Sequence, residues 1–155
     1  MPAKPIPDGY NAVTPYLIVK NAAQALDFYK RALGARERMR LTAPDGKIGH
    51  AEIEVGGSCV MLADEHPEMG HVGPETIGGT PVSLHVYVED VDARFHQALA
   101  AGGKEKRAVA DQFYGDRSGS FEDPYGHLWH LSTHKEDLSP DEINRRAEKL
   151  FGKKQ

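Results

Sequence analysis

The sequence contains the same order of strand and helix signals twice, and this internal repeat limits the possible folds more than any other feature. In the first copy, a β-rich run at 13–19 precedes a segment, 22–33, whose apolar residues recur at helical spacing. Gly34 is predicted to end that helix. In the second copy, a similar run at 82–88 precedes a helical segment at 91–101 that ends in a glycine pair. One β–α unit is therefore repeated in order and in type.

Three further strands are expected after each helix, separated by turn signals such as Asp45-Gly46 and Asp123-Pro124-Tyr125-Gly126. The expected strands lie at 37–41, 50–55 and 58–63 in the first copy, and at 106–110, 119–122 and 127–133 in the second. Each half then reads β, α, β, β, β. The sequence thus predicts an α+β fold built from two tandem βαβββ modules.

This pattern divides the chain into five parts. They are an extended N-terminal arm at 1–12, a first module at 13–65, a glycine-rich linker at 66–80, a second module at 81–134, and a C-terminal helix and tail at 135–155. The last helix has a capping box, with Ser139 at the N-cap, Pro140 at the first helical position and Glu142 three residues after the cap. Its apolar residues share one face, so we expect it to pack on the body or on a second subunit.

Two phrases carry a resemblance to a known family. Residues 25–34 (ALDFYKRALG) are similar to the first-helix phrase of the glyoxalase/bleomycin-resistance/dioxygenase (vicinal oxygen chelate) superfamily, and 123–127 (DPYGH) to the hairpin before its last strand. The phrases at 86–92 and 111–117 resemble its PhnB-like branch. The resemblance covers the body of the chain and implies cupped mixed sheets around a cavity. It also implies a homodimer, the commonest closed assembly.

The resemblance also bears on metal binding. In metal-dependent members, four ligands come from the first and last strands of the two modules, and the pattern carried over gives Thr14, Met61, Ser83 and His130. Of these, only His130 suits a divalent ion, because hydroxyls hold such ions weakly and a thioether is a soft ligand. Conventional glyoxalase I or ring-cleaving dioxygenase activity is therefore not expected.

A shifted metal site is the alternative. His50, His85 and His130 could bind zinc or nickel through three imidazoles, leaving an open position for water, with Glu52 or Glu54 as a base. No HxH or HExxH spacing accompanies these histidines, so hydrogen-bonded cavity or surface residues are the simpler reading.

The period-two alternation of strands predicts which side chains share the cavity face, whereas Trp129 and Leu131 point toward packed helix. Arg117 is predicted to pair with Asp116 or to hold an anionic ligand. Aromatic residues at 113 and 114 could line the cavity mouth. The predicted ligand-binding set is Thr14, Tyr16, Met61, Ser83, His85, Tyr87, Phe113, Tyr114, Arg117 and His130.

Two functions follow from these alternatives. The first is a protein that binds a small organic molecule in the cupped-sheet cavity without the conventional metal tetrad. The second is a metal-assisted isomerase or lyase of the vicinal oxygen chelate type that uses the shifted histidine site. Whether the chain is an enzyme depends on which alternative holds.

The net charge and the cysteine content indicate which partners and which cellular compartment to expect. The net charge of −4, with both signs dispersed, supplies no basic stripe for a phosphate backbone, so nucleic acid is not an expected partner. Residues 1–10 have no apolar run that could form a signal peptide or a membrane span, and no membrane partner is expected. Cys59 is the only cysteine, which suits a reducing compartment such as the cytoplasm, and we expect a buried, inert thiol.

Overall fold

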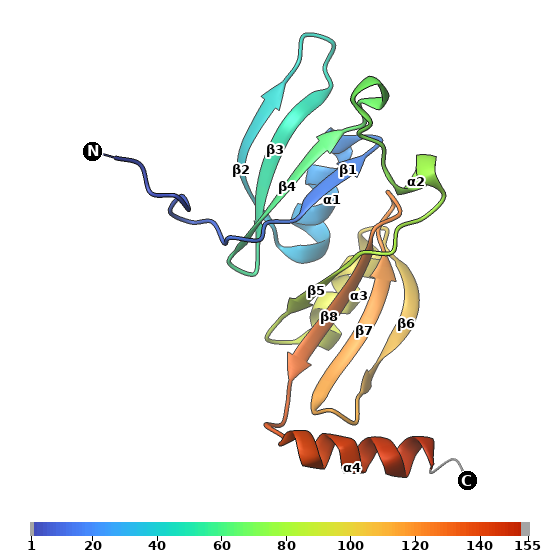
Figure 1. The fold of residues 1–155 in the computed structure, drawn as a ribbon. Helices are drawn as coiled ribbons and strands as arrows, with labels where there is room; N and C mark the ends of the chain where they lie inside the picture. Colours follow the sequence, from blue (N-terminus) through green and yellow to red (C-terminus); the bar gives the residue numbers. More distant parts are fainter. Residues whose placement is uncertain (1, 153–155) are drawn as a thin grey trace.

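The computed structural model describes residues 2–152 and contains two modules with the same order of elements (Figure 1). The first module consists of β1 (Tyr16–Val19), α1 (Ala22–Leu33), β2 (Arg36–Thr42), β3 (Ile48–Val55) and β4 (Ser58–Asp64). The second consists of β5 (Ser83–Tyr87), α3 (Val91–Ala100), β6 (Lys104–Asp111), β7 (Asp116–Glu122) and β8 (Leu128–His134). The predicted α+β fold of two tandem βαβββ modules is confirmed. Met1 of the predicted arm and 153–155 of the predicted tail lie outside the described residues.

Each module forms one mixed four-stranded sheet. The strand orders are β1-β4-β3-β2 and β5-β8-β7-β6, and in both sheets the first strand pairs parallel with the last. The other neighbours pair antiparallel. A parallel pair needs a crossover connection, which α1 supplies in the first module and α3 in the second.

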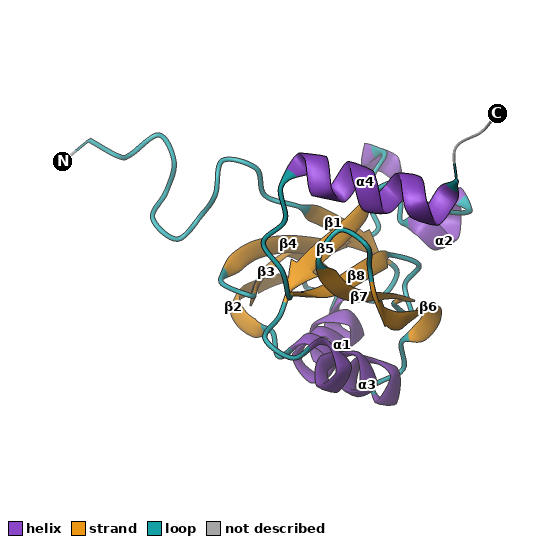
Figure 2. Ribbon diagram, turned by 90° about the horizontal axis from the view of Figure 1, so that it is seen from below, coloured by secondary structure: helices purple, strands orange, loops and turns teal. Residues whose placement is uncertain are grey.

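The two sheets share one helical layer. Helices α1 and α3 pack against each other on one side of both sheets, and α4 (Pro140–Phe151) lies on the opposite side, near the second sheet (Figure 2). The sheet surfaces directed away from α1 and α3 are called the open faces below. The hydrophobic core lies between the sheets and α1 and α3. Side chains on the open faces are therefore available to contact a ligand or another chain.

Local signals explain the helix ends. The side chain of Asn21 caps α1 by accepting a hydrogen bond from the backbone N–H of Gln24, at 3.2 Å. Gly34 adopts the left-handed conformation (φ +65°) that ends the helix, as predicted. In α4 the backbone N–H of Glu142 donates to Ser139 Oγ at 3.1 Å, which confirms the predicted N-cap.

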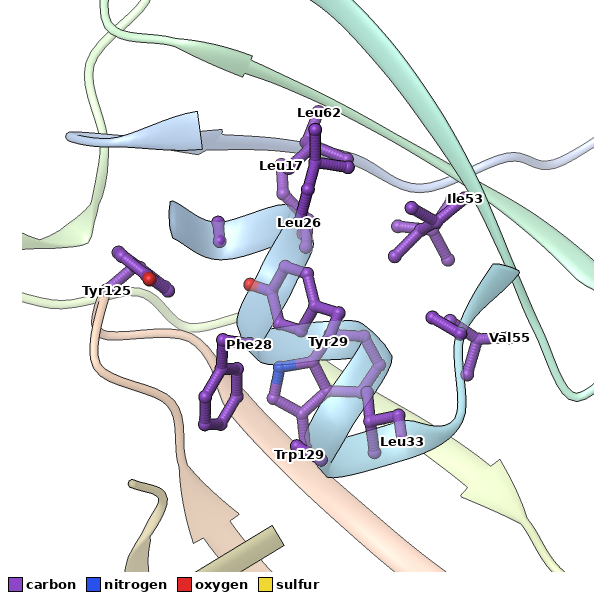
Figure 3. Packing of buried hydrophobic residues seen from close by; sticks show 14 of the residues in the cluster. Leu17, Leu26, Phe28, Tyr29, Leu33, Ile53, Val55, Leu62, Tyr125 and Trp129 are labelled. Atoms are coloured by element: carbon purple, nitrogen blue, oxygen red, sulfur yellow. The ribbon is translucent and has the colours of Figure 1, made fainter. Parts of the chain in front are cut away.

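One continuous core joins the modules (Figure 3). Trp129 on β8 lies beside Tyr29 on α1, with ring centroids 5.3 Å apart, and Phe28 of α1 contacts Phe121 of β7. Trp129 and Leu131 face the helices, as the alternation predicts. Burying large aromatic side chains from both modules makes each module depend on the other for its core.

Two features differ from the sequence-based expectation. The first strand starts at Tyr16 rather than Val13, and Pro15, which has no N–H to donate, only accepts a hydrogen bond from the Met61 N–H. The predicted linker contains two short helices, η1 (Pro67–Met69) and α2 (Pro74–Ile77), each with proline near its start and a left-handed glycine at its end. No helix within residues 2–152 is long and apolar enough to cross a membrane.

Candidate functional site

A groove of about 640 Å³ runs between the edge strands β1 and β5, where the two sheets meet. Its lining residues are Asn11, Val13, Pro15, Tyr16, Leu17, Val55, Gly56, Ser58, Cys59, Val60, Val82, Ser83, Leu84, His85, Val86, Tyr87 and Trp129. The lining drawn from the described residues includes no Asp, Glu, Lys or Arg. A groove with apolar walls and few polar groups is the usual form of a small-molecule site.

On the second module, three rings lie together on the open face. The imidazole of His85 is 5.0 Å from the ring of Tyr87 and 5.9 Å from that of His130, centroid to centroid. His85 Nε2 is hydrogen-bonded to Ser132 Oγ at 2.7 Å. His130 is held at both nitrogens, by Ser120 Oγ at 2.6 Å and Ser83 Oγ at 3.1 Å.

This environment favours a neutral His130. Partial burial, followed by the charges of His85 and Arg107, lowers the pKa of His130 below its ordinary value. A neutral imidazole between two hydroxyl groups can accept one hydrogen bond and donate another. The open face of the second module beside the groove is therefore aromatic and polar.

On the first module, a chain of hydrogen bonds begins in the groove at Tyr16. The hydroxyl of Tyr16 is 2.8 Å from His50 Nδ1, and His50 Nε2 is 2.8 Å from Glu52 Oε2. Glu52 is only 5% exposed, and its other oxygen accepts a hydrogen bond from the Tyr10 hydroxyl. The carboxylate is thus bound at both oxygens inside the protein.

The charge state of Glu52 reflects competing effects. Burial alone would raise its pKa, but hydrogen bonds from His50 and Tyr10 and the charge of Arg38 together lower it below the ordinary value. Glu52 is therefore an anion at neutral pH. Tyr10 belongs to the N-terminal arm, and its ring lies under the guanidinium of Arg38, 4.7 Å from ring centroid to Cζ.

The contact between the N-terminal arm and Glu52 was not predicted from the sequence. The proline-rich composition of the arm predicts an extended segment, but nothing local indicates that Tyr10 reaches a carboxylate on β3, because the two are adjacent only in the folded chain. Cys59 lies nearby, with Sγ 3.9 Å from Glu52 Oε1. It is buried, as expected, and burial raises the pKa of its thiol, which disfavours the reactive thiolate form.

The strand registers show which of the predicted residues lie side by side. Met61 lies opposite Tyr16, and His130 lies opposite His85. Residues that lie opposite each other point to the same face, so each pair shares the open face of its sheet. Thr14 precedes β1 and donates to the carbonyl of Asn11 at 3.0 Å.

Of the ten predicted ligand-binding residues, six are not among the lining residues of the groove: Thr14, Met61, Phe113, Tyr114, Arg117 and His130. Phe113 and Tyr114 are in the β6–β7 hairpin, where Phe113 meets Phe151 of α4 with ring centroids 5.7 Å apart. Arg117 pairs with Asp92 at 2.8 Å and Asp111 at 3.2 Å, on the helix side of the sheet.

The predicted pairing of Arg117 with Asp116 is wrong. Neighbouring residues of a strand point to opposite faces, so the Asp116 carboxylate lies on the open face. There it accepts a hydrogen bond from the Tyr87 hydroxyl at 3.1 Å and is bonded to His134 Nδ1 at 2.7 Å.

The histidines do not fit a three-imidazole metal site in this arrangement. His50 lies on the first sheet, bonded to Tyr16 and Glu52, whereas His85 and His130 lie on the second. Both ring nitrogens of His50 and of His130 are already hydrogen-bonded to protein groups. Within residues 2–152, no group of three or more His, Cys, Asp or Glu side chains is arranged to hold a metal ion.

The fold agrees with what similarity to known proteins shows. The model of the Glyoxalase/Bleomycin resistance protein/Dioxygenase superfamily matches residues 9–131, and the chain belongs to this superfamily. The protein Mb0911c of Mycobacterium bovis is 44% identical over 135 residues, which cover 85% of this chain and 89% of that protein.

Two solved structures are also similar. TioX from Micromonospora sp. ML1 is 27% identical, with a TM-score of 0.62, covering 83% of this chain and 100% of that one. Protein PA1353 from Pseudomonas aeruginosa is 27% identical, with a TM-score of 0.65, covering 80% of this chain and 98% of that one. Both likenesses span the two modules and support the same architecture.

Proposed function

We propose that this protein binds a small, uncharged organic molecule with a planar ring in the groove between its two modules. The supporting observation is the lining, which combines apolar walls with the rings of Tyr16, His85 and Tyr87 and includes no Asp, Glu, Lys or Arg among the described residues. Aromatic rings favour offset or edge contacts with a planar ligand. A charged ligand would lose its hydration in the groove without meeting an Asp, Glu, Lys or Arg side chain of opposite charge.

We also propose that a second copy of the chain covers the open faces. Large apolar side chains remain exposed there, including Tyr87 at 61% and Leu41 at 58%, and the apolar end of α4 exposes Phe151 at 72%. Large exposed apolar side chains on both sheets and on α4 are the kind of surface that a protein–protein interface covers. A homodimer with two-fold symmetry would bury these surfaces and close the groove.

The phrases at 86–92 and 111–117 support placement in the PhnB-like branch of the superfamily. The single buried thiol supports a cytoplasmic location.

The binding proposal is tested by thermal-shift screening of uncharged aromatic compounds, followed by calorimetric titration of the compounds that raise the melting temperature. Tyr87→Ala and His85→Ala are expected to weaken binding of such a compound about tenfold or more, since each removes a ring from the groove. Tyr114→Ala, in the hairpin beside α4, is the matched control and should bind as the wild type does. Equal affinity in all four proteins would overturn the proposal.

Elemental analysis of untagged protein separates this function from the metal-dependent isomerase or lyase. Stoichiometric zinc or nickel that is lost from both His85→Ala and His130→Ala would support the shifted site and count against the metal-free binder. Metal content that does not change in these variants would leave His50, His85 and His130 without a metal role.

A further inference from the structure

We propose that Tyr10 is a positioning residue for the groove, because its contacts with Arg38 and Glu52 hold the N-terminal arm in place as one wall of the ligand site. These contacts, together with that of Arg38 with Gly9, are called the clasp below. The inference rests on the proposed function for the presence of a ligand in the groove. It goes beyond that function by making ligand binding and the order of the arm depend on each other.

The arm supplies part of the groove itself. Asn11, Val13 and Pro15 line the groove and lead directly into β1. Residues 2–15 nevertheless belong to no helix or strand, and Val13 is 86% exposed. The N-terminal end of the arm extends away from both modules (Figures 1 and 2). Burial of apolar surface therefore contributes little to holding this wall in place.

Contacts from two strands hold the arm immediately before the wall. The Tyr10 hydroxyl donates to Glu52 Oε1 on β3. The guanidinium of Arg38 on β2 lies over the Tyr10 ring, with Cζ 4.7 Å from the ring centroid. Arg38 Nη1 also donates to the carbonyl of Gly9 at 2.9 Å. Two consecutive residues of the arm are thus held by side chains of the first sheet.

Gly9 shows how closely the arm approaches Arg38. Its φ of +82° is in the left-handed region that favours glycine. A Cβ at this position would lie 2.6 Å from Arg38 Nη2. Any other residue would have to displace the guanidinium that contacts the Tyr10 ring. The clasp therefore depends on glycine at position 9.

The charges at the clasp favour its closed form. Glu52 is 5% exposed, so loss of the Tyr10 hydroxyl would remove a donor from a buried carboxylate. The hydrogen bond to Glu52, followed by burial, raises the pKa of Tyr10 above its ordinary value. The phenol therefore keeps its proton at neutral pH and remains a donor.

The clasp lies beside the groove. Glu52 Oε1, which accepts the hydrogen bond from Tyr10, is 3.9 Å from the Sγ of Cys59, and Cys59 lines the groove. Tyr10 directly precedes Asn11, the first lining residue of the arm. A ligand that contacts the arm wall binds the clasped protein better than the unclasped one. By linkage, the same ligand stabilises the clasp.

Fluorescence titration measures the contribution of the clasp to binding. The probe is N-phenyl-1-naphthylamine, an uncharged aromatic amine that emits more strongly in apolar surroundings. Tyr10→Phe removes only the hydroxyl and should raise the dissociation constant of the probe about tenfold, because a smaller fraction of the protein has the wall in place. Tyr114→Phe, which removes a hydroxyl of the β6–β7 hairpin, should bind the probe as the wild type does.

NMR relaxation of the backbone amides of residues 11–14 measures the order of the arm independently of binding. Their order parameters should fall below about 0.6 in Tyr10→Phe, the range of flexible backbone. Gly9→Ala should have the same effect on order and on affinity. Gly46→Ala is its matched control, because Gly46 also has a positive φ, +86°, but a Cβ there meets no atom within 4 Å.

The two measurements separate the clasp from the binding function. Wild-type order parameters in both Tyr10→Phe and Gly9→Ala would overturn the clasp. A disordered arm with wild-type affinity for the probe would overturn its role as a groove wall. An absence of binding by the wild type would overturn the proposed function and the wall role together, and the order parameters would still decide whether Tyr10 holds the arm. Shifts of the Ser83 and His85 amide signals on addition of the probe show that it lies in the groove.

Discussion

Asp123 is a buried side chain whose hydrogen bonds link the two modules. Its carboxylate accepts hydrogen bonds from the Tyr29 hydroxyl at 2.6 Å and the Trp129 indole at 2.9 Å. It also accepts two backbone N–H groups of its own turn, from Tyr125 at 2.9 Å and His127 at 3.0 Å. Since Tyr29 belongs to α1 and the turn to the second module, one buried carboxylate links both.

Removal of this carboxylate is expected to destabilise the whole chain. Asp123→Ala leaves several buried donors without an acceptor, which should lower the free energy of unfolding by about 3 kcal/mol or more. Urea denaturation followed by tryptophan fluorescence measures the loss. Asp8→Ala is the control, because that carboxylate is exposed and pairs only with Lys4. A loss in Asp123→Ala as small as that of the control would contradict the role of this residue.

At the scale of the elements, His134 joins the end of β8 to the segment that leads to α4. Its Nδ1 is 2.7 Å from Asp116 and its Nε2 is 2.8 Å from Asp137. Hydrogen bonds to Asp116 first, and to Asp137 second, raise the pKa of His134 above its ordinary value of 6.5. The contact therefore depends on pH.

The sign of this dependence follows from the raised pKa. The contribution of the charged His134 is fully present below pH 6.5 and is lost as the pH rises through the raised value of the folded state. Amide exchange of α4 should therefore be slower in mildly acidic than in mildly alkaline buffer, after correction for intrinsic exchange rates. His134→Gln should remove the difference, and an unchanged difference in that variant would show that another group causes it.

At the scale of the whole molecule, the proposed homodimer depends on contacts between the open faces of two chains. Leu41 lies on β2 opposite His50 and is exposed, so a second copy that covers the first sheet would bury it. We expect Leu41→Glu to shift the protein from dimer to monomer in sedimentation velocity, because a buried carboxylate without a partner is costly. Met69→Glu changes an equally exposed apolar residue of the linker and should leave the dimer intact. A monomeric wild type would contradict the dimer.

Much of the fold was predictable because its signals are local. The repeat, the apolar periodicity of α1 and the Ser139 N-cap of α4 each lie within a short window, and the structure confirms them. The side chain of Glu142 pairs with Arg145 and Arg146. The alternation along β8 correctly predicted that Trp129 faces the core. Such signals reflect the geometry of one helix or one strand, which neighbouring residues determine among themselves.

The candidate site was only partly predictable, since its contacts join distant parts of the chain. The sequence by itself determined the order of the elements and the side of each strand on which Tyr16, His50 and His85 lie. Only the tertiary structure decided that Met61 lies opposite Tyr16, that Arg117 pairs across to α3, and that the arm brings Tyr10 to Glu52. Strand register and long-range pairing depend on how whole elements pack, and no local pattern encodes them.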